Sequence, residues 1–168
     1  MSREGFLGLG SNLGDRRANL QAALDALAPR GIAVLRASST YETDPVGPVA
    51  DQPAFLNAAA AVRTDLAPEA LLDAVKAVEA ALGRGPGGVA KGPRVIDVDV
   101  LLLGDVAHAS ERLTVPHPAL LQRRFALIPV LELDMGACTP DGTALADALA
   151  ALPVEEDVRL VGPPLAKR

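Results

Sequence analysis

The chain has 168 residues, of which 49% are hydrophobic and 22% are charged, and this balance excludes a wholly disordered protein. The net charge of −5 argues against a general binder of nucleic acid or of membrane surfaces. The single cysteine, Cys138, excludes an internal disulfide, and no apolar run approaches the ~20 residues of a membrane span. The N-terminus lacks the apolar core of a secretion signal. We therefore expect one domain spanning 1–168, located in the cytoplasm.

The first part of the chain predicts alternating strands and helices. Residues 6–9 favour a short strand, 15–27 favour an amphipathic helix capped by Asp15, and 32–43 favour a second strand. Residues 44–53 contain three prolines and predict a loop, which leads into an alanine-rich strand at 54–64. Pro68 opens a helix that stops at Gly83. Residues 85–92 contain four glycines and predict a loop before a fourth strand at 95–103.

The resulting order, β-α-β-β-α-β, predicts an α+β fold of the ferredoxin-like class, in which an antiparallel sheet carries both helices on one face. The rest of the chain predicts a C-terminal helical extension with short helices at about 119–131 and 144–152. The last residues, about 157–168, predict a loose tail. Because the helices cover one face of the sheet, we expect the opposite face to be open to a ligand.

Two aspartates, Asp97 and Asp99, stand one residue apart in the most apolar of these strands. Alternate side chains of a strand share a face, so both carboxylates are expected on the face of Val95, Leu101 and Leu103. The apolar residues at 96, 98, 100 and 102 form the other face. Two carboxylates so placed can hold a hard cation, which explains charges in an otherwise apolar strand. Aspartates on the solvent side of an antiparallel strand remain an alternative.

Two other segments carry candidate binding groups. Residues 8–15 form a glycine-rich turn at the start of a helix, which predicts either an anion site or a tight structural turn. Phe55 and Asn57 share a face of their strand, where a ring and an amide can stack on and read a flat heterocycle. A core phenylalanine and a strand-edge asparagine are the alternative.

Basic residues gather in or near the loops of this acidic chain, and they suggest a polyphosphate held together with a metal ion. For each of them singly, solvated surface charge is the alternative. His117 lies between two prolines, which fix the backbone and suit a positioned side chain. The basic residues concerned are Arg84, Lys91, Arg94, Arg112, Arg123 and Arg124.

Four segments together resemble the 6-hydroxymethyl-7,8-dihydropterin pyrophosphokinases of folate biosynthesis in order and spacing. They are residues 10–14 (GSNLG), 51–57 (DQPAFLN), 92–99 (GPRVIDVD) and 112–117 (RLTVPH), and the similarity runs from about residue 8 to 149. The resemblance implies the ferredoxin-like fold. It also implies a Mg²⁺-dependent transfer of the β,γ-pyrophosphoryl group of ATP to the hydroxymethyl group of 6-hydroxymethyl-7,8-dihydropterin, with release of AMP. We expect a monomer with these two small-molecule substrates and with no nucleic-acid or membrane partner.

The resemblance implies a role for each matching position. Two Mg²⁺ ions would be held by Asp97 and Asp99, which would act in catalysis with Arg84 and Arg94. The residues implied for ATP binding are Lys76, Glu79, Arg84, Arg94, Val100, Arg112, Thr114, His117 and Arg123. The pterin would lie against Thr43, Pro45, Val46 and Asn57, between the rings of Phe55 and Phe125.

The chain departs from the best-known members of that family at several positions. In the loop at 85–92, Pro86 and Lys91 stand where those members have an arginine and a tryptophan. Pro118 replaces a tyrosine and Leu121 a lysine, whereas Phe55 replaces a tyrosine but keeps the stacking ring. These departures concern the contacts of the loop and leave the reaction as expected.

Two other classes of protein are compatible with parts of the pattern. A palm-type nucleotidyl transferase or cyclase also places two carboxylates on a ferredoxin-like sheet to hold two metals. A ligand-binding regulatory module or an RNA-binding module of the same topology is the non-enzymatic alternative. The acidic charge and the absence of aromatic residues from the fourth strand argue against RNA, and a regulatory module does not need the carboxylate pair.

Overall fold

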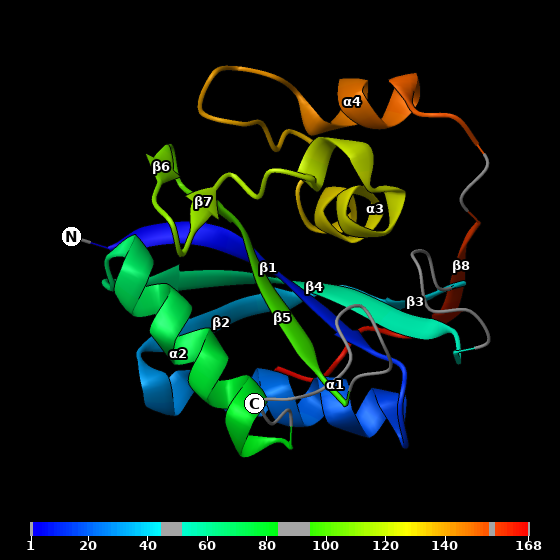
Figure 1. Cartoon of the computed structure of the whole chain (residues 1–168). Helices are drawn as coiled ribbons and strands as arrows, with labels where there is room; N and C mark the ends of the chain where they lie inside the picture. Colours follow the sequence, from blue (N-terminus) through cyan, green and yellow to red (C-terminus); the bar gives the residue numbers. More distant parts are fainter. Residues whose placement is uncertain (1, 45–51, 84–94, 155–156, 168) are drawn as a thin grey trace.

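The computed structural model describes residues 2–44, 52–83, 95–154 and 157–167. An antiparallel sheet of six strands lies at the centre, with α1 and α2 on one face and α3 and α4 on the other (Figure 1). The strands follow one another in the order β5-β1-β4-β3-β8, and β2 also pairs with β4. They are β1 (Arg3–Ser11), β2 (Ile32–Ala37), β3 (Thr40–Thr43), β4 (Phe55–Thr64), β5 (Asp97–Leu103) and β8 (Val158–Gly162).

The main core lies between the sheet and two amphipathic helices, α1 (Arg16–Asp25) and α2 (Pro68–Ala81). Leu20 of α1 and Val75 of α2 are fully buried against Leu7 of β1. Both helices begin as the sequence predicts. The Asp15 carboxylate accepts a hydrogen bond of 3.0 Å from the Ala18 amide, and Pro68 is the first residue of α2.

A second core lies on the opposite face, which was expected to be open. There α3 (Arg124–Leu133) packs on the sheet and α4 (Leu145–Ala151) packs on α3, with a 3₁₀ turn at Leu120–Gln122 before them (Figure 1). Ala59 and Ala61 of β4 are small enough to let α3 approach the sheet closely, and Leu127 fills the interface. The C-terminal helices therefore cover part of this face, and any binding site must lie beside them.

The strand β5 contains a bulge, and the alternation predicted for its last residues is therefore wrong. Leu7 pairs with Val100 but Phe6 pairs with Leu102, so Leu101 is an extra residue on the β5 side. Leu101 and Leu102 consequently both pack in the core beneath α3. Leu103 returns to the core beneath α1 and α2, opposite to the expectation. The bulge follows Asp97 and Asp99 in the chain and leaves their shared face unchanged.

The strand predicted at 32–43 is interrupted at Ser38 and Ser39. The Ser38 hydroxyl accepts a hydrogen bond of 2.8 Å from the Ala59 amide, which takes over one step of the strand pairing. The Ser39 amide and hydroxyl both donate to the Glu132 carboxylate on α3. The Tyr41 hydroxyl donates to the same carboxylate, and burial together with this hydrogen bond raises the pKa of Tyr41. The interruption thus ties the sheet to α3.

The prediction of a loose tail is wrong for most of residues 157–168. Residues Val158–Gly162 form β8, which pairs antiparallel with β3 at the edge of the sheet. Beyond it, the Ala166 amide donates to the Gln21 side chain of α1 over 2.8 Å, and the Gln21 amide group donates back to the Ala166 carbonyl over 2.7 Å. Backbone hydrogen bonds to β3 and polar contacts with α1 therefore hold the C-terminal segment in place.

A short hairpin of β6 (His108–Ala109) and β7 (Thr114–Val115) was also not predicted. None of the helices in the described ranges is both long and apolar enough to cross a membrane.

Candidate functional site

A cavity of about 210 Å³ lies beside α3 on the face of the sheet that carries Asp97 and Asp99. It collects residues from β1, β3, β4, β5, the segment that leads into α3 and the first turn of α3. The described residues that line it are Gly8, Leu9, Gly10, Thr43, Asp44, Phe55, Asn57, Ala58, Asp97, Asp99, Leu101, His117, Leu120, Arg123, Phe125 and Ala126. Aromatic rings, an amide, carboxylates, an imidazole and a guanidinium that are far apart in the sequence therefore meet around one space.

Two glycines of β1, Gly8 and Gly10, line this cavity where side chains would otherwise reduce it. A Cβ atom at Gly8 would lie 3.3 Å from the Leu101 side chain, and one at Gly10 would lie 3.3 Å from Asn57 Oδ1. The two glycines thus leave room beside the other lining residues. The alternative of an anion site at the start of α1 gains no support, because Asp15 itself caps that helix.

The aromatic and amide groups predicted to hold the pterin line the cavity together. Phe55 lies at the start of β4 and Phe125 in the first turn of α3. The buried Asn57 side chain donates from Nδ2 to Thr43 Oγ1 over 2.8 Å, which fixes the orientation of its amide. Because Nδ2 is engaged, Oδ1 points toward Gly10. The guanidinium of Arg123 lies over the Phe125 ring, 5.5 Å from its centroid.

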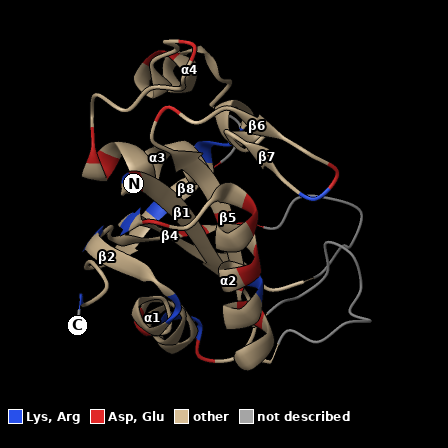
Figure 2. Cartoon of the chain, turned by 90° about the vertical axis from the view of Figure 1, so that its left-hand side faces the viewer, with Lys and Arg blue, Asp and Glu red and all other residues tan. Residues whose placement is uncertain are grey.

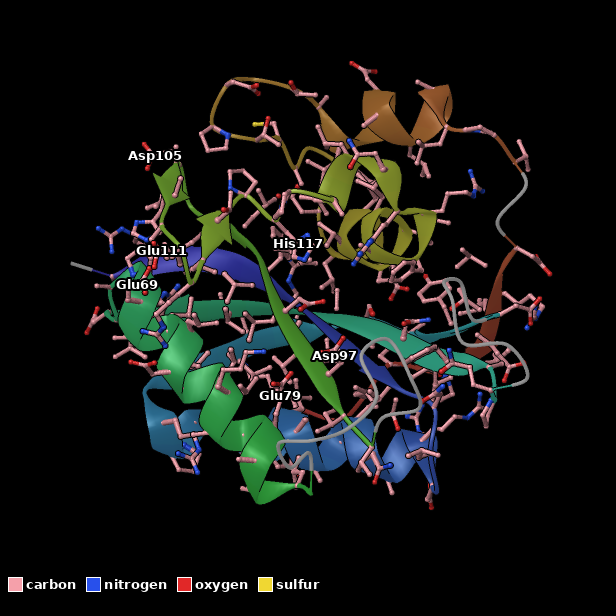
Figure 3. The ribbon with its side chains drawn as sticks, in the orientation of Figure 1. Glu69, Glu79, Asp97, Asp105, Glu111 and His117 are labelled. Atoms are coloured by element: carbon pink, nitrogen blue, oxygen red, sulfur yellow. The ribbon has the colours of Figure 1, made fainter. Side chains whose placement is uncertain are left out.

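The two aspartates of β5 both line the cavity, as their spacing predicts. The pKa of Asp99 is raised to about 6. Burial is the larger cause, and repulsion from Asp97 is the second. The positive charge of Arg123 opposes this rise without cancelling it. In Figure 3, Asp97 lies on β5 between the labelled side chains of His117 and Glu79. Two carboxylates that repel one another in a partly buried space form a favourable position for a cation.

The donor set fits magnesium better than a metal that needs a complete cage of side chains. Within the parts of the chain that the structure describes, no group of three or more His, Cys, Asp or Glu residues could hold a metal ion. Magnesium is commonly bound by one or two carboxylates, with water and substrate phosphates completing its octahedron. Asp97 and Asp99 supply that number of ligands beside a space for a substrate.

The backbone places His117 beside the carboxylates. Its amide donates to the Leu101 carbonyl on β5 over 3.0 Å, and its Nδ1 accepts from the Ala119 amide over 3.1 Å. Burial is the main cause that lowers the pKa of His117, and the nearby positive charge of Arg123 lowers it further. The ring is therefore neutral at neutral pH. Because Nδ1 accepts, Nε2 carries the proton and is a hydrogen-bond donor.

Among the described residues predicted to bind ATP, Glu79 is the most buried, with 3% of its surface exposed. Its Oε2 accepts a hydrogen bond of 2.7 Å from the Val98 amide of β5, and its Oε1 lies 3.2 Å from Lys76 Nζ. Glu79 therefore joins α2 to the strand that carries the aspartates. This contact is structural, and the contact of Glu79 with ATP stays a prediction.

Replacing Glu79 by alanine is expected to lower the free energy of unfolding by about 1–3 kcal/mol, because the buried Val98 amide loses its acceptor. Glu79→Gln keeps an acceptor and is expected to lose less. Lys76→Ala provides the control, since the Lys76 side chain is 53% exposed and its surface ion pair contributes little. Urea denaturation of the three variants measures the difference, and equal losses in Glu79→Ala and Lys76→Ala would refute the structural role.

Like Glu79 and Lys76, three other residues predicted to bind ATP are not part of the cavity lining. Arg112 pairs with Glu69 over 3.3 Å and with Asp73, both on α2, where acidic residues follow one another along the helix (Figure 2). Thr114 is exposed on β7, and Val100 is buried in the core beneath α1 and α2. The roles of all three in ATP binding stay predictions.

Other predicted positions fall outside the described residues. These are Pro45, Val46, Arg84, Lys91 and Arg94, together with the loop at 85–92. Conversely, sequence reasoning did not assign Asp44, Leu101, Leu120 and Ala126 to the site. Gly8 and Gly10 could have been found from their spacing, because glycines two residues apart in a strand leave one face bare.

Comparison with known proteins agrees with the resemblance. The sequence model of the 7,8-dihydro-6-hydroxymethylpterin-pyrophosphokinase (HPPK) family matches residues 6–135. The chain is 44% identical over 161 residues to the 2-amino-4-hydroxy-6-hydroxymethyldihydropteridine pyrophosphokinase of Pseudomonas aeruginosa, covering 94% of this chain and 96% of that protein. It is 43% identical to the Methylorubrum extorquens protein of the same name, covering 88% and 92%.

Solved structures show the same fold at low sequence identity. The Plasmodium falciparum HPPK-DHPS crystallised with SDX-DHP superposes with a TM-score of 0.69 at 14% identity. The match covers 89% of this chain and 44% of that chain, so this chain corresponds to less than half of the Plasmodium protein. The extent of the sequence match, with the high coverage of the bacterial relatives, shows that the chain belongs to the 7,8-dihydro-6-hydroxymethylpterin-pyrophosphokinase family.

Proposed function

We propose that the cavity beside α3 is the active site of this family member and that its carboxylate pair binds magnesium. The family reaction is the transfer of the pyrophosphoryl group of ATP to 6-hydroxymethyl-7,8-dihydropterin in folate synthesis. One observation carries the assignment of the site. The ring-binding group of Phe55, Asn57 and Phe125 and the carboxylate pair of Asp97 and Asp99 line the same cavity.

The pterin ring lies between Phe55 and Phe125 in this proposal, with Asn57 held by Thr43 to meet its polar edge. Stacking supplies contact area on both faces of a flat ring, and the amide supplies both a donor and an acceptor. The glycines of β1 provide the space. Pro45 and Val46 complete the pterin site in the proposal.

The phosphates of ATP lie toward the cationic side of the cavity. Arg123 lines it, and the neutral His117 offers a hydrogen-bond donor at Nε2. Lys76 stands nearby on α2, and its charge acts on Asp99. Arg84 and Arg94 complete the proposed phosphate contacts and act in catalysis. Glu79, Val100, Arg112 and Thr114 are the remaining proposed nucleotide contacts.

Asp97 and Asp99 hold two Mg²⁺ ions in this proposal. When bound, the metal supplies neutralisation of phosphate charge and a lower pKa for the attacking hydroxyl group. The side chains themselves position the reactants, because transfer requires the pterin hydroxyl, the β-phosphorus and the leaving AMP oxygen to lie in line. No side-chain nucleophile is needed. The enclosing rings and leucines limit the access of water, which would otherwise hydrolyse ATP.

We also propose the ferredoxin-like class with a C-terminal helical extension for the fold. The antiparallel order β5-β1-β4, with β2 and β3 both beside β4, supports this class. A monomer acting in the cytoplasm completes the proposal.

The products of the reaction test the proposed function. Incubation with ATP, Mg²⁺ and 6-hydroxymethyl-7,8-dihydropterin is expected to release one AMP for each pterin consumed, and a chelator in excess over the metal is expected to stop the reaction. Separation of nucleotides by ion-exchange chromatography measures the outcome. ADP as the product would contradict pyrophosphoryl transfer, and release of inorganic pyrophosphate would indicate a nucleotidyl transferase. Undiminished turnover with the chelator would contradict the magnesium site.

A further inference from the structure

We propose that Arg16, Glu42 and Arg159 are positioning residues for the pterin side of the cavity, an inference that rests on the proposed function. None of the three lines the cavity. Together they hold the two chain segments that carry Thr43 and Phe55.

Glu42, on β3, is the centre of this group. Its Oε2 lies 2.7 Å from Arg16 Nη2, and its Oε1 lies 3.2 Å from Arg159 Nη2. The hydrogen bond from Arg16, and to a smaller extent the one from Arg159, hold the pKa of the Glu42 carboxyl below its usual range. The carboxylate is therefore ionised at neutral pH, with each oxygen engaged by a different guanidinium.

Each arginine also reaches a residue at the cavity: Arg159 reaches Asp44, which lines it, and Arg16 reaches Ala54, which precedes the lining residue Phe55. Arg16 Nη1 donates to the Ala54 carbonyl over 2.9 Å, immediately before Phe55. Arg159 Nη2 lies 3.4 Å from the carboxylate of Asp44, immediately after Thr43. Thr43 and Phe55 are themselves directly paired between β3 and β4. The three side chains thus fix the last residue of β3 and the first residue of β4 relative to each other.

Arg159 brings the C-terminal strand into this arrangement. It lies on β8, and its Nη1 is oriented by Asp157 over a distance of 2.8 Å. β8 lies outside residues 6–135, the region matched by the family. A part of the chain beyond the matched region therefore supports the pterin side of the cavity.

The expected contribution of these contacts is to geometry more than to stability. A single exposed ion pair contributes little, but a network that uses both oxygens of one carboxylate with planar guanidinium groups restrains direction as well as distance. Loss of Arg159 releases Asp44 and leaves Glu42 with one partner. Thr43, which orients the Asn57 amide, then loses a restraint. A small misplacement of binding groups weakens the affinity for the substrate they hold.

Steady-state kinetics of Arg159→Ala and Glu42→Gln test the proposal. In each variant the KM for the pterin is expected to rise about five- to tenfold, while the KM for ATP stays within about twofold of the original. Arg159→Lys keeps the charge but not the planar fork and is expected to recover part of the loss. Arg63→Ala is the control. Its exposed pair with Glu4, at 3.8 Å, lies at the other end of β4, and neither KM is expected to change.

The outcomes separate this inference from the proposed function. An unchanged pterin KM in both folded variants would overturn the inference, as would an equal rise in both KM values. If Arg159→Ala fails to fold by circular dichroism, Glu42→Gln alone decides, because it keeps the shape of the side chain. Phe55→Ala is measured in parallel. If Phe55→Ala leaves the pterin KM unchanged, the cavity is not the pterin site and the proposed function fails. If only the Phe55 variant changes, only the inference fails.

Discussion

Replacing Asp97 or Asp99 by asparagine is expected to lower kcat by about 10²- to 10³-fold, the scale of effect seen when a group that stabilises developing charge is removed. Asparagine keeps the size of the side chain and one oxygen but loses the negative charge that would attract magnesium. Turnover measured across a range of Mg²⁺ concentrations checks the reason for the loss. Excess metal is expected to recover part of the activity only if the affinity for the metal has been weakened.

Of these two substitutions, Asp99→Asn is also expected to stabilise the protein when no metal is present. The pKa of Asp99 is raised to about 6 because burial and the charge of Asp97 disfavour its ionised form. At pH 7 the folded protein therefore holds a carboxylate whose charge is less favourable than in the unfolded chain. The stability that the protonated group contributes is lost as the pH rises from 3.8 to about 6, and it stays lost above that value. Asp99→Asn removes this cost, and the free energy of unfolding is expected to rise by about 1 kcal/mol.

Urea denaturation with a chelator at pH 7 measures this gain. Asp105→Asn serves as the control, because Asp105 is exposed and lies after β5, away from the cavity (Figure 3). It is expected to change neither stability nor turnover. Near-original activity in either Asp97→Asn or Asp99→Asn would contradict the metal site. A clear loss of stability in Asp99→Asn would show that the carboxylate has a structural role that its surroundings do not reveal.

Replacing Phe55 by alanine is expected to raise the KM for the pterin by about 10- to 100-fold, which is the effect of losing one stacking contact worth ~1–3 kcal/mol. The ring lies beside Gly10, which has no side chain of its own to take the place of the ring: a Cβ atom there would lie 3.7 Å from Phe55 Cδ1. The KM for ATP is expected to change little, because the phosphates lie at the other side of the proposed site. Kinetics with each substrate varied in turn measure the difference.

Phe55→Tyr is the matched variant for this experiment, since it keeps the ring. Its pterin KM is expected to stay near the original value. If the alanine and tyrosine variants are equally impaired, the space around Phe55 and not stacking is what matters. If Phe55→Ala raises the KM for ATP instead, the two substrates have been placed at the wrong ends of the cavity.

The parts of the fold that could be predicted are those with a long, regular pattern of apolar residues. The helical stripe of Leu71, Val75 and Val78 is buried in α2, and the Asp15 cap begins α1 where expected. The strand β8 was not predicted because its sequence does not alternate between apolar and polar residues. Its neighbouring apolar residues Leu160 and Val161 both remain exposed. The bulge in β5 depends on its pairing with β1, and a run of three leucines gives no sign of which one is extra.

The candidate site likewise has parts that could be predicted from the sequence and parts that could not. Alternation within one strand predicted that Asp97 and Asp99 share a face, and likewise Phe55 and Asn57. That these two pairs share a single cavity depends on β1, which lies between their strands in the sheet. The partners of Arg112 could not be predicted, because Glu69 and Asp73 meet it only after the hairpin of β6 and β7 packs on α2. Position in the sequence indicates which residues are chemically suited to a site but not which of them are already engaged.

The contacts at the outer edge of β5 also bear on self-association. An edge strand offers unpaired backbone groups to which a strand of another chain can add, which is a common route to aggregation. On β5, Glu79 engages the Val98 amide and the His117 amide engages the Leu101 carbonyl, so this edge is closed at two points. At the opposite edge, β8 exposes 66% of Leu160 and 51% of Val161, and no strand of the described residues pairs beyond it. Aggregation of a destabilised chain is therefore expected to begin at β8, on the side of the sheet away from the aspartates.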